Sequence, residues 1–196
     1  MNTVSYTYKE SLYLNITNKC MMACPYCMKN KRNNEFHGND LRLEKEPDAQ
    51  EIINSIVDIK KYKEIIFCGY GDAMTRPEIV KEVSKWIKDN GGTVRINTAG
   101  LANRFWGRNI LPEFKGLVDA VSVSLNGTNA KEHNEINRPM FGEESFDEIL
   151  KFVKEAKNYI PSVTITAVAF DNLDVSKVEQ IAKDLGVKFR VRPYEG

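Results

Sequence analysis

The sequence has almost no net charge, two histidines, four cysteines and no long hydrophobic run. Its 28 basic and 27 acidic residues leave a formal charge of +1, so we expect no direct nucleic acid binding and no attraction to an anionic membrane. No apolar stretch approaches the roughly 20 residues of a membrane-spanning helix. The first residues lack the basic start and apolar block of a signal peptide. We therefore expect a cytoplasmic protein, whose cysteines stay reduced.

Three of the four cysteines are close together: Cys20, Cys24 and Cys27 form a CxxxCxxC pattern directly after the strand-like run 11–17. Thiolates are the usual ligands of iron–sulfur clusters, and a cubane [4Fe–4S] cluster usually takes four of them. Three clustered thiolates would hold such a cluster and leave one iron open to a small molecule. A disulfide within this cluster is disfavoured, because the cluster has three cysteines and the loops between them are short.

A zinc site is the alternative interpretation of the same cysteines, with His37 as the fourth ligand of a Cys3His set. Such a protein would be a non-catalytic binding module. The second cysteine pair that usually accompanies a zinc site is missing. The remaining cysteine, Cys68, lies in an apolar run, and its default interpretation is a buried, unreactive core thiol.

Short β-branched runs alternate with amphipathic segments, which predicts parallel strands joined by helices. We expect strands near 11–17, 63–68, 93–98, 119–125, 162–168 and 187–193. We expect helices near 47–60, 77–90, 103–115, 146–159 and 174–185. Six βα units are too few for a full eight-stranded barrel. The expected fold class is therefore α/β, a partial (β/α)6 barrel with a curved parallel sheet and outer helices, in one domain over 1–196.

The stretch 28–46 is polar and weakly patterned, and it follows the three cysteines directly. Loops of this length in a compact domain are usually either functional or disordered. We favour a loop that covers the active site, with plain disorder as the alternative.

Glycines and polar side chains gather where three of the expected strands end, the edge at which parallel sheets bind ligands. Glycine lets the backbone approach a ligand closely, and polar residues at every second position of a buried strand indicate a cavity. The candidate binding residues are Gly69, Tyr70, Gly71, Asp72, Asn97, Thr98, Ser122, Ser124, Asn126 and, in the next loop, Arg138. A simple turn is the alternative for 97–98, and a solvated side chain is the alternative for Arg138.

The first and last expected strands also carry polar side chains on one face. The candidate substrate contacts are Tyr13, Asn15, Thr17, Arg190 and Arg192, and Tyr194 shares the face of the two arginines. Two arginines on one face of a strand indicate either a pocket floor or a solvated edge, and we favour the pocket. His133 lies in a charged helical stretch, where we expect it on the surface.

The cysteine spacing, its place at a strand end and the aromatic Tyr26 just before the third cysteine resemble the radical S-adenosylmethionine (SAM) enzymes. Taken whole, the chain looks like their TatD-associated group from about residue 11 to about residue 194. The segments that carry the resemblance are 12–20, 69–72, 95–101, 122–126 and 138–142. The Asp72-Ala73 pair departs from the Glu-Pro that usually follows the glycines in these enzymes.

The resemblance implies a [4Fe–4S] cluster held by the three cysteines, with SAM on its open iron. It implies that the glycine segment 69–72 binds the methionine amino group and that Arg138 clamps the SAM carboxylate. It implies SAM contacts from Tyr26 and from the polar residues of 97–98 and 122–126. In these enzymes SAM is cleaved to methionine and a 5′-deoxyadenosyl radical, which abstracts a hydrogen atom from the substrate.

Within this group the chain resembles queuine lyases, which cut the cyclopentenediol from queuine and leave 7-aminomethyl-7-deazaguanine. On that interpretation its partners are a small deazapurine substrate and an electron donor such as flavodoxin or ferredoxin, and its role is the salvage of queuosine precursors. Auxiliary clusters are not expected, because the cysteine-rich extension that often carries them is missing. The alternative within the same cofactor class is an enzyme that modifies another small molecule, a protein or an RNA.

Overall fold

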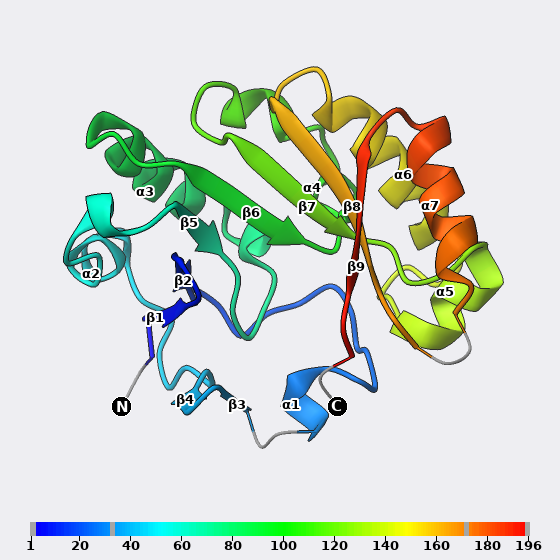
Figure 1. Cartoon of the computed structure of the whole chain (residues 1–196), viewed down its shortest axis with the longest axis horizontal. Helices are drawn as coiled ribbons and strands as arrows, with labels where there is room; N and C mark the ends of the chain where they lie inside the picture. The colour runs from blue at the N-terminus through cyan, green and yellow to red at the C-terminus, as the bar shows by residue number, and fades with distance from the viewer. Residues whose placement is uncertain (1–2, 32–33, 171–172, 195–196) are drawn as a thin grey trace.

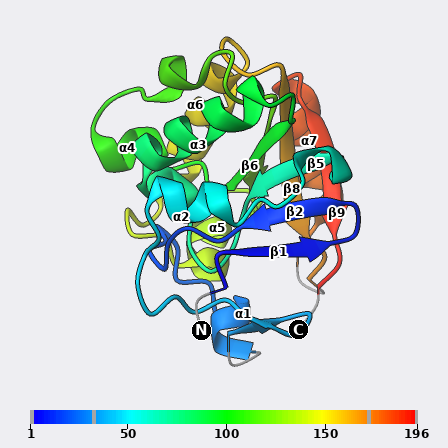
Figure 2. The same cartoon turned by 90° about the vertical axis from the view of Figure 1, so that its left-hand side faces the viewer.

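The computed structural model describes residues 3–31, 34–170 and 173–194, and its centre is a seven-stranded sheet (Figure 1). In sheet order the strands are β1 (Ser5–Tyr8), β2 (Ser11–Leu14), β5 (Glu64–Phe67), β6 (Val94–Thr98), β7 (Ala120–Ser124), β8 (Ser162–Val168) and β9 (Lys188–Arg192). All neighbours from β2 to β9 are parallel, and β1 alone pairs antiparallel with β2 at one edge (Figure 2).

Helices connect the parallel strands and lie on the outer side of the curved sheet, where α3, α6 and α7 are prominent (Figure 1). The α-helices are α1 (Met28–Lys31), α2 (Ala49–Asn54), α3 (Pro77–Asp89), α4 (Ala102–Trp106), α5 (Ala130–Asn137), α6 (Glu144–Ala156) and α7 (Val175–Asp184). The 3-10 helices are η1 (Ile59–Lys61), η2 (Ala73–Thr75) and η3 (Leu111–Phe114). A small hairpin pairs β3 (Glu35–Phe36) with β4 (Asn39–Asp40). No helix among the described residues is both long enough and apolar enough to cross a membrane.

The two faces of the sheet differ in chemistry because side chains alternate along each strand. The outer face packs against the helices in one hydrophobic core. Its strand residues include Leu12, Leu14, Ile65, Phe67, Val94, Ile96, Val121, Val123, Val163 and Ile165. The inner, concave face is mostly polar. Its residues include Tyr13, Glu64, Cys68, Arg95, Asn97, Ser122, Ser124, Thr164, Thr166, Arg190 and Arg192. A polar inner face is unusual for a parallel sheet, and it indicates a surface that receives ligands.

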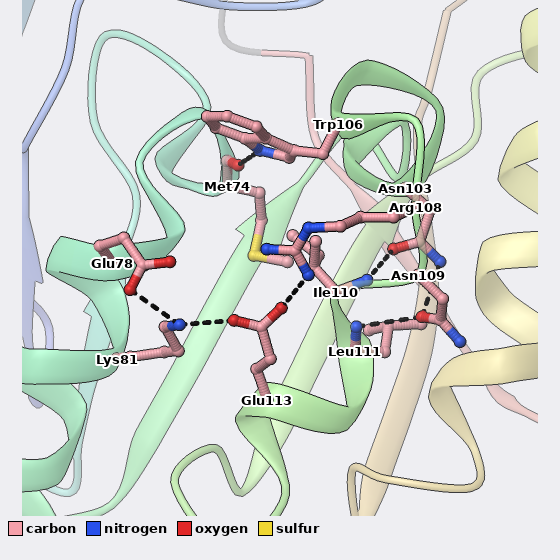
Figure 3. A network of polar contacts seen from close by, with 10 residues as sticks. All are labelled: Met74, Glu78, Lys81, Asn103, Trp106, Arg108, Asn109, Ile110, Leu111 and Glu113. Carbon is pink, nitrogen blue, oxygen red and sulfur yellow. Dashed lines mark hydrogen bonds and ion pairs between the residues drawn. The ribbon is translucent and has the colours of Figure 1, made fainter.

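Polar contacts tie the outer helices together at the surface (Figure 3). Lys81 of α3 forms ion pairs with Glu78 and with Glu113 of η3, and Glu113 also pairs with Arg108. These side chains are partly exposed, so each pair contributes little to stability. Their effect is to fix η3 against α3.

The expected fold class is confirmed: a mostly parallel curved sheet is surrounded by helices. All six expected strands are present, within three residues at each end. The helix expected at 47–60 is divided into α2 and η1, and the one expected at 103–115 is divided into α4 and η3. The second break follows Gly107, whose φ of 65° ends α4 in the left-handed conformation. The elements not expected from the sequence are β1, the β3–β4 hairpin, α1 and η2. The helix α5 falls in the stretch around His133 that was expected to be helical, although no bounds were given for it.

Candidate functional site

The loop that carries the three cysteines follows the carboxyl end of β2, where a ligand of a parallel sheet is expected. All three are free thiols; Cys20 is exposed, and Cys24 and Cys27 are half-buried. The loop is held by the segment that follows α5. The amide of Ala23 donates to the carbonyl of Asn137 at 3.2 Å, and the amide of Met140 donates to the carbonyl of Met21 at 3.0 Å.

The donor set fits an iron–sulfur cluster better than a single metal ion. Within the described ranges, no three His, Cys, Asp or Glu side chains gather closely enough to hold one ion. Thiolates of a cubane cluster bind different irons, so they need not converge on one point. The ring of His37 stacks on Tyr8, with 4.7 Å between centroids, and contacts Phe36 edge-on. The zinc alternative therefore does not find its expected ligand set.

The glycines after β5 are required by close packing against the cysteine loop. A Cβ on Gly69 would lie 2.2 Å from Oδ1 of Asn15, and one on Gly71 would lie 2.3 Å from the carbonyl oxygen of Lys19. The amide of Tyr70 donates to Oδ1 of Asn15 at 2.9 Å. This packing brings the backbone of 69–71 beside the cysteine loop, as a shared cofactor site would need.

Asn15 is buried and its hydrogen-bonding groups are used within the protein. Besides accepting from Tyr70, it donates to the carbonyls of Thr3 and Leu41, at 2.9 and 2.8 Å. These contacts differ from the substrate contact expected from the sequence. They make Asn15 a residue that positions three separate segments around the end of β2.

Thr17 is also engaged with the protein, because its hydroxyl donates to Oε1 of Glu46 at 2.6 Å. Glu46 ends the stretch 28–46, which contains α1 and the β3–β4 hairpin. Leu41 and Leu43 in this stretch are fully or almost fully buried. Its described part is therefore packed against the end of β2, which does not fit plain disorder, and its role as a cover stays a proposal.

Asp72 is buried, and both of its carboxylate oxygens accept hydrogen bonds from the protein. Oδ1 accepts from the amide of Met74 at 3.0 Å, and Oδ2 accepts from the hydroxyl of Thr98 at 2.9 Å and the amide of Ala99 at 2.7 Å. Burial raises the pKa of Asp72, and these hydrogen bonds oppose the rise. Asp72 and Thr98 thus join the ends of β5 and β6, whereas the sequence suggested that both face the cofactor.

Asn97 differs from its neighbour because it lies on the concave face and has a free acceptor. Its Oδ1 is buried without a hydrogen-bond partner among the described residues. A buried unsatisfied carbonyl is costly, and it is commonly satisfied by a ligand or a water. Ser122 beside it accepts a hydrogen bond from Nη1 of Arg95 at 3.1 Å, and Ser124 is half-buried on the same face.

Cys68 lies on the concave face beside Asn97, whose side chain hydrogen-bonds to it. It is only half-buried, whereas a fully buried core thiol was expected. Its surroundings raise the pKa of the thiol through desolvation. The neutral thiol is therefore favoured, in agreement with the unreactive character expected from the sequence.

Tyr26 belongs to a polar network that joins the cysteine loop to β7 and α5. Its hydroxyl donates to Oδ1 of Asn137 at 2.6 Å and accepts from Nδ2 of Asn126 at 2.7 Å. Cys24 lies against the same Oδ1, with 3.9 Å between sulfur and oxygen. Nδ2 of Asn137 donates to the carbonyl of Asn126 at 2.7 Å and to the carbonyl of His133 at 2.8 Å. Asn137 is therefore the hub of the network. Asn137 was not singled out from the sequence, since one asparagine at a helix end forms no pattern.

His133 was expected on the surface, which is wrong: only 1% of His133 is exposed. Burial lowers the pKa of His133 from 6.5 to about 4. The charged residues around it in the sequence point outward, and the histidine occupies the inner side of the short helix α5. Arg138 follows, exposed and in the left-handed conformation, with φ of 47°.

Tyr13, Arg190 and Arg192 share the concave face. Tyr13 is half-buried, whereas both arginines are exposed on the edge strand β9, which fits a solvated edge as well as a pocket wall. Burial lowers the pKa of Arg190, with smaller contributions from Arg95 and Arg192. Tyr194 packs with its ring 5.3 Å from that of Phe170. Arg95 and Glu64 were not singled out from the sequence, although their positions on the strands put them on this face.

Comparison with known proteins agrees with this arrangement. A family model described as the radical SAM superfamily matches residues 14–185. The chain belongs to the radical SAM superfamily. This membership implies a [4Fe–4S] cluster and SAM as cofactors, as the cysteine pattern predicts. The structure is compatible with the cluster and with SAM, because it has three free thiols, glycine backbone close to the cysteine loop and an unpartnered carbonyl on Asn97.

In sequence, this radical SAM chain is similar to an uncharacterised protein of Methanocaldococcus jannaschii, with 28% identity over 184 residues. The match covers 91% of this chain and 60% of the relative, so the chain spans less than two thirds of that protein.

Two solved structures share the fold. SuiB of Streptococcus suis superimposes with a TM-score of 0.70 at 13% identity, over 96% of this chain and 40% of that one. A radical SAM methyltransferase of Sphaerobacter thermophilus gives a TM-score of 0.61 at 13% identity, over 98% and 69% of the two chains. At these identities the likeness concerns the fold alone.

Proposed function

We propose that this radical SAM enzyme acts on a small polar molecule held on the concave face of its sheet. The observation that carries the proposal is the difference between the two faces. The outer face is apolar and packed against helices, whereas the concave face presents hydroxyl, amide and guanidinium groups. The buried carbonyl of Asn97 on this face is costly unless a polar ligand or a water satisfies it. The nearly balanced charge of the chain argues against RNA as the substrate.

In this proposal Cys20, Cys24 and Cys27 hold the cluster. The backbone of 69–71 and Asn97 contact SAM, and exposed Arg138 reaches its carboxylate. Tyr26 and Asn126 hold each other and the cysteine loop in place, and Ser122 and Ser124 are further candidate contacts. When bound, the cofactors supply an organic radical that abstracts a hydrogen atom. The chain's own contribution is to orient the substrate and exclude water.

The first candidate reaction is cleavage of the C–N bond of queuine, which releases 7-aminomethyl-7-deazaguanine. Its support is the likeness of the chain to the TatD-associated group, together with the supply of polar groups on the concave face. Glu64 is the carboxylate of that face and would accept from the amidine edge of the deazaguanine. Flavodoxin or ferredoxin would deliver the electron.

The second candidate is an anionic small molecule as the substrate, within the same chemistry. It is favoured by the three arginines of the concave face, Arg95, Arg190 and Arg192, against the single carboxylate Glu64. Queuine carries a secondary amine that is protonated at neutral pH. A face with excess positive charge suits an anion better than such a cation.

Anaerobic reconstitution with iron and sulfide, followed by dithionite and SAM with or without queuine, tests the proposal by mass spectrometry. Formation of 5′-deoxyadenosine together with the aminomethyl base establishes the lyase. Deoxyadenosine without the base retains radical SAM chemistry and excludes queuine. A reconstituted protein with a cluster that never yields deoxyadenosine contradicts the proposed function. The control is Cys24→Ala, which removes one thiol of the cysteine loop and should yield neither the cluster nor deoxyadenosine.

A further inference from the structure

A cavity of about 380 Å³ lies at the end of the sheet that is remote from the cysteine loop. Its walls come from the turn between β1 and β2 and from the first residues of the parallel strands, including Ser11, Glu64 and Arg95. The cysteines follow the carboxyl end of β2 instead. Because β2, β5 and β6 are parallel, the cavity and the cysteine loop lie at opposite ends of the same concave face.

The lining of the cavity carries excess positive charge. Lys9, Lys63, Arg95 and Arg190 contribute four positive charges, and two carboxylates, one of them Glu64, contribute the negative ones. Glu64 is already neutralised, since Nη2 of Arg95 lies 2.7 Å from its Oε2.

Among the described residues no ion pair involves Arg190, and none involves the two lysines of the lining or its second carboxylate, Glu10. The neighbours of Arg190 on the concave face, Arg95 and Arg192, are also cations. Three guanidinium groups in one region repel each other, and the repulsion is relieved when an anion binds between them. Desolvation and this crowding lower the pKa of Arg190, although the residue is exposed on the edge strand β9.

Tyr13 gives the cavity a rigid aromatic wall. Its ring stacks on that of Tyr6, with 5.2 Å between centroids, and meets the ring of Tyr8 edge-on. Burial raises the pKa of Tyr13 to about 12, so its hydroxyl remains a hydrogen-bond donor at neutral pH. Tyr13 and Arg190 both line the cavity, so this hydroxyl is a second possible donor to a bound anion.

From this geometry we propose that the cavity binds the anionic group of a small molecule, a carboxylate or a phosphate, through Arg190. Guanidinium is the natural partner of such groups, because its planar fork donates two parallel hydrogen bonds. The inference deepens the proposed function and rests on it in one respect: the group would belong to the substrate. The site would hold the substrate by a part remote from the bond that reacts.

Calorimetric titration of the reconstituted protein with inorganic phosphate and, separately, malonate tests the site in the absence of SAM and reductant. We expect one of the two anions to bind, and the choice between them distinguishes phosphate from carboxylate. Arg190→Gln should weaken that binding about tenfold or more, because it removes a charge-assisted fork. Arg190→Lys should weaken it less, since the charge remains.

The matched control is Arg104→Gln, which removes the same charge from an exposed position on α4. It should bind the anion like the unaltered protein. Circular dichroism of each variant shows whether the fold is retained. Failure of both anions to bind, or equal binding by a folded Arg190→Gln variant, overturns the inference. If the protein binds an anion but never cleaves SAM, the anion site stands and the proposed function is contradicted.

Discussion

The two ends of the concave face are built from different residues. At the carboxyl ends of the strands most groups are uncharged: cysteine thiols, glycine backbone, and the amides of Asn97, Asn126 and Asn137. The carboxylate of Asp72 at this end is hydrogen-bonded to Thr98 and Ala99 of the protein, and Arg138 and Arg192 are exposed. At the amino ends the groups are charged, with Arg190 close to Arg95 and Glu64. An end of mostly uncharged groups suits a cofactor held by many short contacts, and a cationic end suits recognition of one charged group.

The largest expected effect is a complete loss of function at one end of the concave face, with binding at the other end unchanged. Cys24→Ala should abolish cluster assembly and SAM cleavage, because two thiolates are too few to hold a cubane. The same variant should bind phosphate or malonate like the unaltered protein. Iron analysis, deoxyadenosine formation and calorimetry on one preparation check both statements. Loss of anion binding in Cys24→Ala would show that the two ends are a single site.

Replacement of the hub of the cysteine-loop network should be the next largest effect. Asn137→Ala removes the Oδ1 that accepts from Tyr26 and Asn126. It also removes the amide that donates to the carbonyls of Asn126 and His133. We expect a loss of about 3 kcal/mol in the free energy of unfolding and incomplete cluster incorporation. Urea unfolding and iron content measure these effects. Asn158→Ala, on the exposed surface, is the control, and identical behaviour of the two variants would argue against the hub.

Acid should lower the free energy of unfolding through protonation of His133, which lies beside Asn137 near the cysteine loop. Burial lowers the pKa of His133 to about 4 from 6.5 in the unfolded chain. The unfolded chain therefore binds the proton first on acidification, so stability is full above about pH 6.5 and falls between about pH 6.5 and 4. Near pH 5 the loss should reach about 2 kcal/mol.

Urea unfolding at neutral pH and near pH 5 measures this loss. His133→Gln should lose much less stability on acidification than the unaltered protein, whereas the surface variant Asn158→Ala should retain the full dependence. An unchanged acid response in His133→Gln would assign the effect to other groups.

The smallest expected effect on stability concerns the unpartnered carbonyl of Asn97. Asn97→Ala removes an acceptor that the protein itself does not satisfy, so the free energy of unfolding should change by less than about 1 kcal/mol. Binding of SAM to the reconstituted, unreduced protein should weaken about tenfold if this carbonyl contacts SAM. Calorimetry checks the affinity, with Asn158→Ala as the control. An unchanged affinity for SAM would show that Asn97 does not contact SAM.

The sequence predicted the fold well because its signals are local. Alternation of β-branched runs with amphipathic segments located the six parallel strands, and the spacing of Cys20, Cys24 and Cys27 indicated the cofactor. It gave no sign of β1 and no bounds for α5, since both are short and their strand or helical character depends on the neighbours that they pack against.

What the sequence by itself determined is therefore the order of the elements, the cysteine loop and the polar faces of the strands. Only the tertiary structure decided which of those polar groups bond to the protein itself and which stay free for a ligand. It turned Asn15, Asp72 and Thr98 toward the protein, left the carbonyl of Asn97 free, buried His133 and brought Arg190 beside Arg95. The physical reason is that a side chain's partner is set by distances between segments far apart in the chain, which no local pattern records.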